Sequence, residues 1–371
     1  MIVPLLDLRR TPELDEALTA AFARVLASGN YIQGPEVDAF ERAIATSIGV
    51  EHAIGVSSGT DALLAVLMAL DVGPGDEVIV PTYTFFATAG VVARLGATPV
   101  FVDSRPDDFA IDPEGVRASL GPRTKAIVPV HLFGQCADMS AILEVAGDVP
   151  VIEDAAQAIG ARYHGRAAGT LARAACFSFF PAKNLGAFGD AGLVTTDDAD
   201  LAARVRRIRV HGAEPKYVHH EVGGNFRLDA LQAALLGVKL PHLEAATEAR
   251  RAHAAFYDHA FAASPSIATP PELADRYHAY NQYVVAVEER DDVKAALAGL
   301  GVASAVYYPR PLHLQPCFAG LGHRDGAFPV AERLSERLLA LPVFPELTRE
   351  ELEHVAESLE RCVDQRKRSG T

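Results

Sequence analysis

The chain has 371 residues, of which 49% are hydrophobic and 22% charged, and these proportions are ordinary for a soluble globular enzyme. Its formal net charge of −14 argues against a nucleic acid as a partner. There is no 18-residue apolar run and no basic, then apolar leader after Met1, so we expect neither a membrane span nor a signal peptide. The four cysteines show no CxxC spacing and predict reduced thiols in the cytoplasm.

Short β-branched segments alternate with Ala- and Leu-rich segments up to about residue 200, which predicts an α/β domain with a largely parallel sheet. Seven strands are predicted, at His52–Val56, Glu77–Pro81, Thr98–Val102, Lys125–Val130, Pro150–Glu153, Ala175–Phe180 and Leu193–Thr196. A second domain is expected from about Leu240, with strands at Gln282–Val287 and Ala303–Tyr308 and a late amphipathic helix at Arg349–Val363. The predicted domains are therefore 1–240 and 241–371, and packing of the N-terminal segment on the second domain is left open.

The first informative turn, residues 57–60, lies between a strand ending at Val56 and an apolar helix. The free N–H groups at the start of such a helix form a ready phosphate site. An ordinary helix cap by Ser58 or Thr60 would show the same pattern, so the turn alone leaves both interpretations open.

A pair of residues later in the chain, Asp154 and Lys183, indicates a cofactor. Asp154 ends a short apolar stretch, and Lys183 follows 29 residues later in a loop that contains Gly186, Gly189 and Gly192. Ligands gather beyond the carboxyl ends of strands in open α/β sheets, and this spacing lets both side chains face one pocket. A pyridoxal phosphate (PLP) site needs such a pair, a desolvated lysine and an acid against the ring nitrogen. A surface lysine in a turn and a helix-capping carboxylate are the alternatives.

Residues 153–157 (Glu-Asp-Ala-Ala-Gln) together with residues 178–186 (Ser-Phe-Phe-Pro-Ala-Lys-Asn-Leu-Gly) resemble the DegT/DnrJ/EryC1 family, the sugar aminotransferases of PLP fold type I. The resemblance extends from Pro4 to Leu347. It implies a large PLP-binding domain with a mostly parallel seven-stranded sheet and a smaller α+β C-terminal domain.

The resemblance also implies roles for individual residues. Lys183 would carry PLP as a Schiff base, and Asp154 would pair with the ring nitrogen. Further cofactor contacts are implied at the phosphate, the ring face and the ring's phenolic oxygen: Gly59, Thr60 and Ser178; Phe85; and Gln157. Asn225, in Gly-x-Asn-x-Arg, would reach the phosphate in a partner subunit, which implies a homodimer with composite active sites.

The substrate contacts come from two other stretches. Arg209 and His211 lie in an Arg-x-His-Gly sequence that resembles a family stretch near the site, although basic runs on helices usually form a solvated face. Tyr308 and His313 lie in a stretch that resembles the subgroup acting on 3-keto nucleotide sugars, although they could simply pack a Pro-rich turn. The resemblance thus implies transamination of a dTDP- or UDP-linked 3-keto sugar, with L-glutamate as amino donor.

Three alternatives to this function remain open: amination at C4 of the sugar, a PLP-dependent sugar dehydratase, and a non-catalytic regulator on the same fold. Dehydratases of the family carry His at the position of Lys183, and the intact cofactor residues argue against a regulator. No HExxH or clustered Cys/His pattern occurs, so we expect no metal, and we interpret His131 as an interior histidine.

Overall fold

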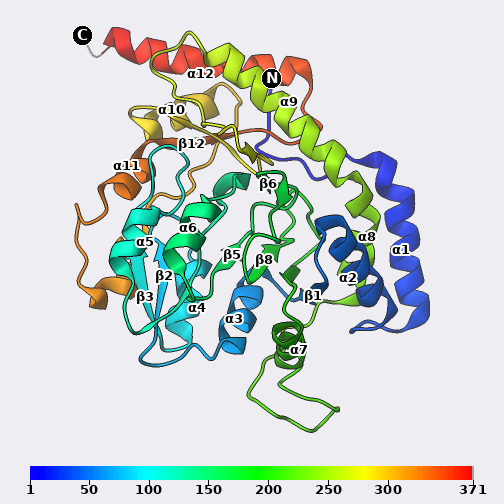
Figure 1. Ribbon diagram of the computed structural model, residues 1–371. Coiled ribbons are helices and arrows are strands. Elements are labelled where there is room, and N and C mark those ends of the chain that lie inside the picture. Colours follow the sequence, from blue (N-terminus) through cyan, green and yellow to red (C-terminus); the bar gives the residue numbers. More distant parts are fainter. Residues whose placement is uncertain (370–371) are drawn as a thin grey trace.

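The computed structural model describes residues 1–369, and its main body is a sheet with helices on both faces (Figure 1). Bridges between Ile127 and Val151 and between Val130 and Asp154 join a three-stranded and a four-stranded part in the order β3-β2-β4-β5-β8-β9-β1. Neighbouring strands run parallel except at β9, which is antiparallel to both β8 and β1. The mostly parallel seven-stranded sheet expected from the sequence is confirmed.

The strands lie close to their predicted positions. Their bounds are β1 His52–Val56, β2 Glu77–Pro81, β3 Thr98–Val102, β4 Thr124–Ile127, β5 Ile152–Asp154, β8 Ala174–Ser178 and β9 Gly192–Thr196. Strand β4 ends three residues before the predicted Val130, because residues 128–130 pair only through isolated contacts with β2 and β5.

Helices cover both faces of this sheet, which explains why its strands are apolar along nearly their whole length. Successive strand residues point to opposite faces, and in β2 Val78 and Val80 enter one core while Ile79 enters the other. The first core lies under α3 (Gly59–Ala69), α4 (Ala87–Arg94) and α7 (Ala199–Ile208). The second lies under α1 (Asp15–Ser28), α2 (Pro35–Ile48), α5 (Pro113–Ser119), α6 (Met139–Ala146) and α8 (Ala230–Lys239).

A third core forms around the antiparallel pair β11 (Tyr283–Ala286) and β12 (Leu338–Leu341). The helices nearby are α9 (Leu243–Phe261), α10 (Arg290–Gly299), α11 (Pro329–Arg337) and α12 (Arg349–Ser369). Val3 joins this core and bridges Val302, so the N-terminal segment packs against the C-terminal third of the chain. A small sheet, β10 (Arg276–Tyr277), β6 (Arg162–Tyr163) and β7 (Arg166–Ala167), lies apart from the others.

The predicted strand at Ala303–Tyr308 is wrong. Only a single bridge, between Ala305 and Ala340, ties this segment to β12. The backbone groups of Tyr307 and Tyr308 instead bond the side-chain hydroxyl of Tyr83. The β-branched and aromatic residues that suggested a strand therefore lead the chain out of the sheet, towards the cavity described below.

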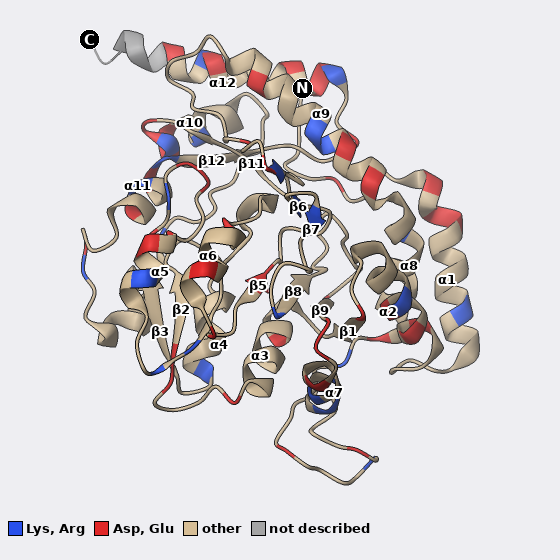
Figure 2. Cartoon of the chain, viewed as in Figure 1, with Lys and Arg blue, Asp and Glu red and all other residues tan. Residues whose placement is uncertain are grey.

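Charged residues lie mainly on outer helices such as α1, α9 and α12, and the central strands carry few of them (Figure 2). The acidic end of β5 is a visible departure from this pattern. Its Glu153 is fully buried and accepts hydrogen bonds from the backbone N–H groups of Gly169, Leu171 and Ala172. His131 is fully buried beside it, with its Nε2 2.9 Å from Glu153 Oε2, as expected for an interior histidine. Among residues 1–369, no helix is both long and apolar enough to cross a bilayer.

Candidate active site

A cavity of about 390 Å³ lies where the ends of β5 and β8 meet the start of α3. Eight of the residues singled out in the sequence line it: Gly59, Thr60, Phe85, Asp154, Gln157, Ser178, Lys183 and Tyr308. They come from five separate stretches of the chain, so the fold gathers into a single pocket one of the four substrate residues and all the predicted cofactor residues except Asn225.

One end of the cavity is built to hold an anion. Ser58 caps α3 by accepting the N–H of Asp61 at 3.0 Å, and the N–H groups of Gly59 and Thr60, which come before the first helical hydrogen bond, have no acceptor within the helix. Gly59 lies against β8, where a side-chain carbon would come within 2.8 Å of Ser178 Cβ. Ser178 Oγ accepts the Phe180 N–H at 3.3 Å, so its own proton is free for a ligand. These donors suit a phosphate group.

Asp154 lies deep in the wall and is 5% exposed. Burial raises the pKa of its carboxyl group, while the Thr88 hydroxyl, donating at 2.8 Å, and the Ala156 N–H, donating at 3.2 Å, oppose that rise. Its carboxylate is thus oriented by two donors but lacks a full counter-charge, and a cationic ring nitrogen would supply one.

Lys183 follows in the loop after β8, where its backbone N–H bonds Phe180 O at 2.8 Å. Burial lowers the pKa of Lys183 to about 8, although Asp154 acts in the opposite direction. The loop turns tightly, since a side chain at Gly186 would collide with the Pro181 carbonyl. Lys239 Nζ donates to Gly186 O from α8 and holds the loop from behind. The result is an amine whose unprotonated, nucleophilic fraction near neutral pH is larger than that of a solvated lysine.

The remaining walls are aromatic and amide groups. The Phe85 ring is 56% exposed, which leaves an apolar face uncovered towards the cavity. Gln157 accepts the Phe133 N–H at 2.6 Å through Oε1, and its Nε2 donates to Tyr308 Oη at 3.2 Å. An amine, an acid, an anion cradle and a flat apolar ring fit PLP part for part.

Four predicted residues lie outside this cavity. Arg209 is 7% exposed and donates to Glu41 Oε1 at 2.5 Å and to Gly55 O at 2.8 Å. His313 is buried, with Nδ1 2.8 Å from Thr82 Oγ1 and Nε2 3.0 Å from Glu332 Oε1. Neither residue lines this cavity and their polar groups are engaged within the chain, so a contact of Arg209 or His313 with substrate stays a prediction. His211 and Asn225 are exposed on an extended segment after α7 (Figure 1).

Several residues that line the cavity, or that hold its lining residues in place, were not predicted. Asp190 and Gln282 also line the cavity, and Tyr307 lies beside Tyr308 in its wall. Thr88 holds Asp154 from α4, 66 residues away in the chain, and no local pattern signals this contact. Tyr83 lies two residues before Phe85, in a stretch of aromatic residues that usually indicates packing in the core.

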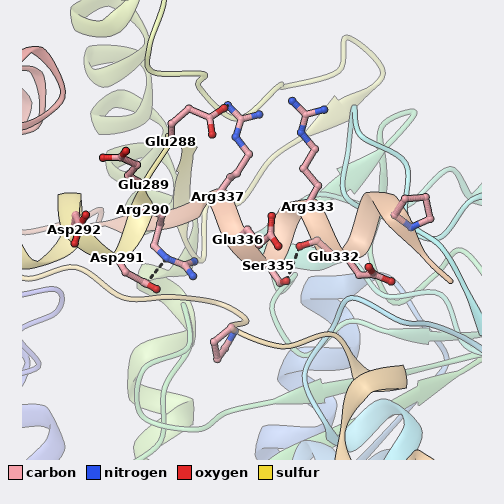
Figure 3. Close-up of a pocket in the computed structure, with 12 residues that line it drawn as sticks. Glu288, Glu289, Arg290, Asp291, Asp292, Glu332, Arg333, Ser335, Glu336 and Arg337 are labelled. Atoms are coloured by element: carbon pink, nitrogen blue, oxygen red, sulfur yellow. Dashed lines mark hydrogen bonds and ion pairs between the residues drawn. The ribbon is translucent and has the colours of Figure 1, made fainter. Parts of the chain in front are cut away.

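A larger cavity, of about 930 Å³, lies between α10 and α11 and differs in chemistry (Figure 3). Six carboxylates and three arginines line it, and two of the arginines are paired, Arg290 with Asp291 and Arg337 with Glu288. It contains no lysine that could form a Schiff base, and its surplus of carboxylates disfavours an anionic ligand. The smaller cavity is therefore the candidate active site.

Comparisons with known proteins agree with this geometry. Residues 12–360 match the DegT/DnrJ/EryC1/StrS aminotransferase family. The chain is 50% identical to a "pleiotropic regulatory protein" of Geobacillus stearothermophilus, covering 97% of this chain and 98% of the relative. It is 45% identical, over the same shares, to the UDP-N-acetyl-3-dehydro-alpha-D-glucosamine 3-aminotransferase of Acidithiobacillus ferrooxidans.

Two solved structures are also similar. DesV of S. venezuelae, in complex with a ketimine intermediate, superposes with a TM-score of 0.96 at 42% identity, covering 98% of this chain and 99% of that one. NtdA of Bacillus subtilis, with bound pyridoxamine phosphate (PMP), superposes with a TM-score of 0.91 at 32% identity, covering 98% and 86%. Fold, pocket and neighbours together define a PLP-dependent aminotransferase. The chain belongs to the DegT/DnrJ/EryC1/StrS aminotransferase family.

Proposed function

We propose that this enzyme transfers an amino group from L-glutamate to the 3-keto group of a dTDP- or UDP-linked sugar, giving an amino sugar for glycan or natural-product biosynthesis. The observation that carries the proposal is the placement of Lys183 and Asp154 in one cavity with the start of α3. The substrate class rests on relatives, since the Acidithiobacillus protein is named for a UDP-linked 3-dehydro sugar.

PLP, when bound, supplies an electron sink for the electrons released at the substrate carbon. Asp154 would keep the ring nitrogen protonated, and Gly59, Thr60 and Ser178 would hold the phosphate. Phe85 would present its ring face to the cofactor and exclude water, and Gln157 would donate to the ring's phenolic oxygen.

Lys183 would perform the proton transfer. With a pKa of about 8, its Nζ would take the proton from the donor's α-carbon and give it to the cofactor's C4′ atom. In the second half-reaction it would move a proton from C4′ to the sugar carbon that receives the amino group. One site then serves both half-reactions in turn, which predicts ping-pong kinetics.

We further propose a homodimer in which Asn225 completes the phosphate site of the partner. Asn225 is exposed in the single chain and does not line its own cavity, which leaves it available to a neighbour. We also propose a cytoplasmic location, on the scattered spacing of the four cysteines and on the substrate class, and a division into domains at about residue 240.

The alternatives are separable by experiment. The relative named as a regulatory protein keeps a non-catalytic role open, and amination at C4 or dehydration of the sugar would use the same cofactor. Intact Lys183 favours transamination over dehydration.

The test is a panel of keto nucleotide sugars, 3-keto and 4-keto with dTDP or UDP, assayed with L-glutamate while 2-oxoglutarate and the sugar product are measured. We expect stoichiometric 2-oxoglutarate and a 3-amino product, with Lys183→Ala as the inactive control. Turnover of the 4-keto sugars but not of the 3-keto sugars would show that the enzyme aminates C4 of the sugar and not C3. A deoxy product without 2-oxoglutarate would identify a dehydratase, and a protein that binds PLP without turning over any sugar would favour the regulator.

A further inference from the structure

A segment from the C-terminal third of the chain closes one side of the active-site cavity. We name residues 307–314 the strap; its first two residues, Tyr307 and Tyr308, line the cavity. The strap makes no ladder with any strand. Its position beside the cavity therefore depends on specific side-chain contacts.

Those contacts come from the residues that follow β2. Tyr83, 1% exposed, donates its hydroxyl proton to Tyr307 O at 2.6 Å and accepts the Tyr308 N–H at 3.1 Å. One hydroxyl thus bonds both the C=O and the N–H group of the peptide that joins Tyr307 to Tyr308. Further along, Thr82 O accepts the Leu312 N–H at 2.8 Å, and Thr82 Oγ1 meets the His313 ring.

The direction of the hydrogen bonds around Tyr308 can be assigned. The Phe133 N–H can only donate, so the Gln157 oxygen faces Phe133 and its Nε2 faces Tyr308. Tyr308 Oη is therefore the acceptor of this bond, and its own proton remains for another acceptor. Burial raises the pKa of Tyr308, so the phenol keeps that proton at neutral pH. In the cavity wall, this proton can be given to a ligand oxygen.

We propose that Tyr83 is a positioning residue that holds the strap so that Tyr308 donates its phenolic proton to the reacting keto oxygen of the substrate. The proposal rests on the proposed function and adds to it the residue that activates the keto group towards attack by the amine, by donating a hydrogen bond to its oxygen. A hydrogen bond that strengthens as charge develops on that oxygen acts mainly on kcat. Tyr83 would act only through Tyr308, since its hydroxyl already has two partners within the chain.

The test compares Tyr83→Phe, Tyr308→Phe and the double variant by steady-state kinetics. The substrates are L-glutamate and a keto nucleotide sugar that is turned over by the wild type, at concentrations up to saturation. We expect each single variant to lose about tenfold in kcat, the size of one useful hydrogen bond, with KM for the sugar nearly unchanged. The double variant should be no slower than Tyr308→Phe, because both changes remove the same proton donation. The near-UV to blue cofactor band should keep its wild-type intensity in all three.

Tyr257→Phe is the matched control, because Tyr257 is also fully buried and donates its hydroxyl to a backbone carbonyl, Pro342 O at 3.0 Å, in the third core. It should lose comparable stability and keep wild-type kcat. Wild-type kcat in Tyr83→Phe, additive losses in the double variant, or an equal loss in Tyr257→Phe would each overturn the proposal. A wild-type protein without cofactor band or turnover would instead overturn the proposed function.

Discussion

The two ends of the active-site cavity are built in different ways. At the phosphate and ring-nitrogen end, Asp154 and Ser178 are the last residues of strands β5 and β8, and Gly59 is the first residue of helix α3. At the opposite end, Tyr308 reaches the cavity only because Tyr83 and Thr82 hold the strap. Cofactor chemistry is thus fixed by the sheet, whereas the wall proposed to face the sugar depends on contacts between distant parts of the chain.

This difference suggests how substitutions at the two ends should differ. A substitution at the sheet end removes a side-chain group that contacts the cofactor from a rigid backbone. It should abolish cofactor chemistry and leave the positions of the other site residues unchanged. A change at the strap end should alter turnover of the sugar and leave cofactor binding intact. The predictions below test this contrast.

Asp154→Asn should cause the largest loss, because the neutral amide cannot keep the ring nitrogen protonated. We expect the half-reaction with L-glutamate to slow about a thousandfold and PLP to be held weakly. Rapid-mixing absorbance and equilibrium dialysis measure the two effects. Asp108→Asn is the control, since burial also raises the pKa of Asp108 but it lies away from the cavity. Near-normal rates in Asp154→Asn would refute the acid assignment.

Arg209→Met should cost stability and leave the site intact. It would strand Glu41 in a largely buried position beside β1, which costs about 3–5 kcal/mol of unfolding free energy. Urea unfolding of Arg209→Met and of its neighbour Arg206→Met separates this pair from ordinary surface arginines. A raised KM for the sugar with unchanged stability would show that Arg209 contacts substrate after all.

Mixing Asn225→Ala with Lys183→Ala subunits should restore activity if the site is composite. A heterodimer would then carry one intact site and one site with both defects, so random mixing should reach at most about a quarter of wild-type activity. The comparison requires that Asn225→Ala alone is clearly impaired and that subunits exchange, for which co-expression serves. Verified heterodimers without recovered activity would place Asn225 in its own subunit's site or in none.

The smallest effect concerns pH. Lys183 loses its proton as pH rises through about 8, and only the free amine captures PLP. The capture rate of the apoenzyme should therefore rise about tenfold per unit below pH 7 and level off above pH 9. Stopped-flow absorbance measures this rate. A rise that continues to pH 10 would mean that Lys183 keeps the ordinary pKa of a solvated lysine.

The sequence predicted the sheet and the sheet end of the site well, because strand patterns and strand-end turns are local signals. It missed Thr88 and Tyr83 because their roles depend on contacts with Asp154 and with the strap, which are far away in the chain. It also read residues 303–308 as a strand, since Val306, Tyr307 and Tyr308 have high β propensity. Only the fold reveals that Tyr83 takes the bonds that a neighbouring strand would have made.

The most direct test of the account is to identify the lysine that carries the cofactor. The PLP-loaded protein should be yellow, and borohydride reduction followed by peptide mapping by mass spectrometry should place the reduced cofactor on Lys183. Asp154→Asn should load less PLP but carry the adduct on the same residue. An adduct on any other lysine, or no adduct on protein with a full cofactor band, would contradict the assignment of this cavity as the active site.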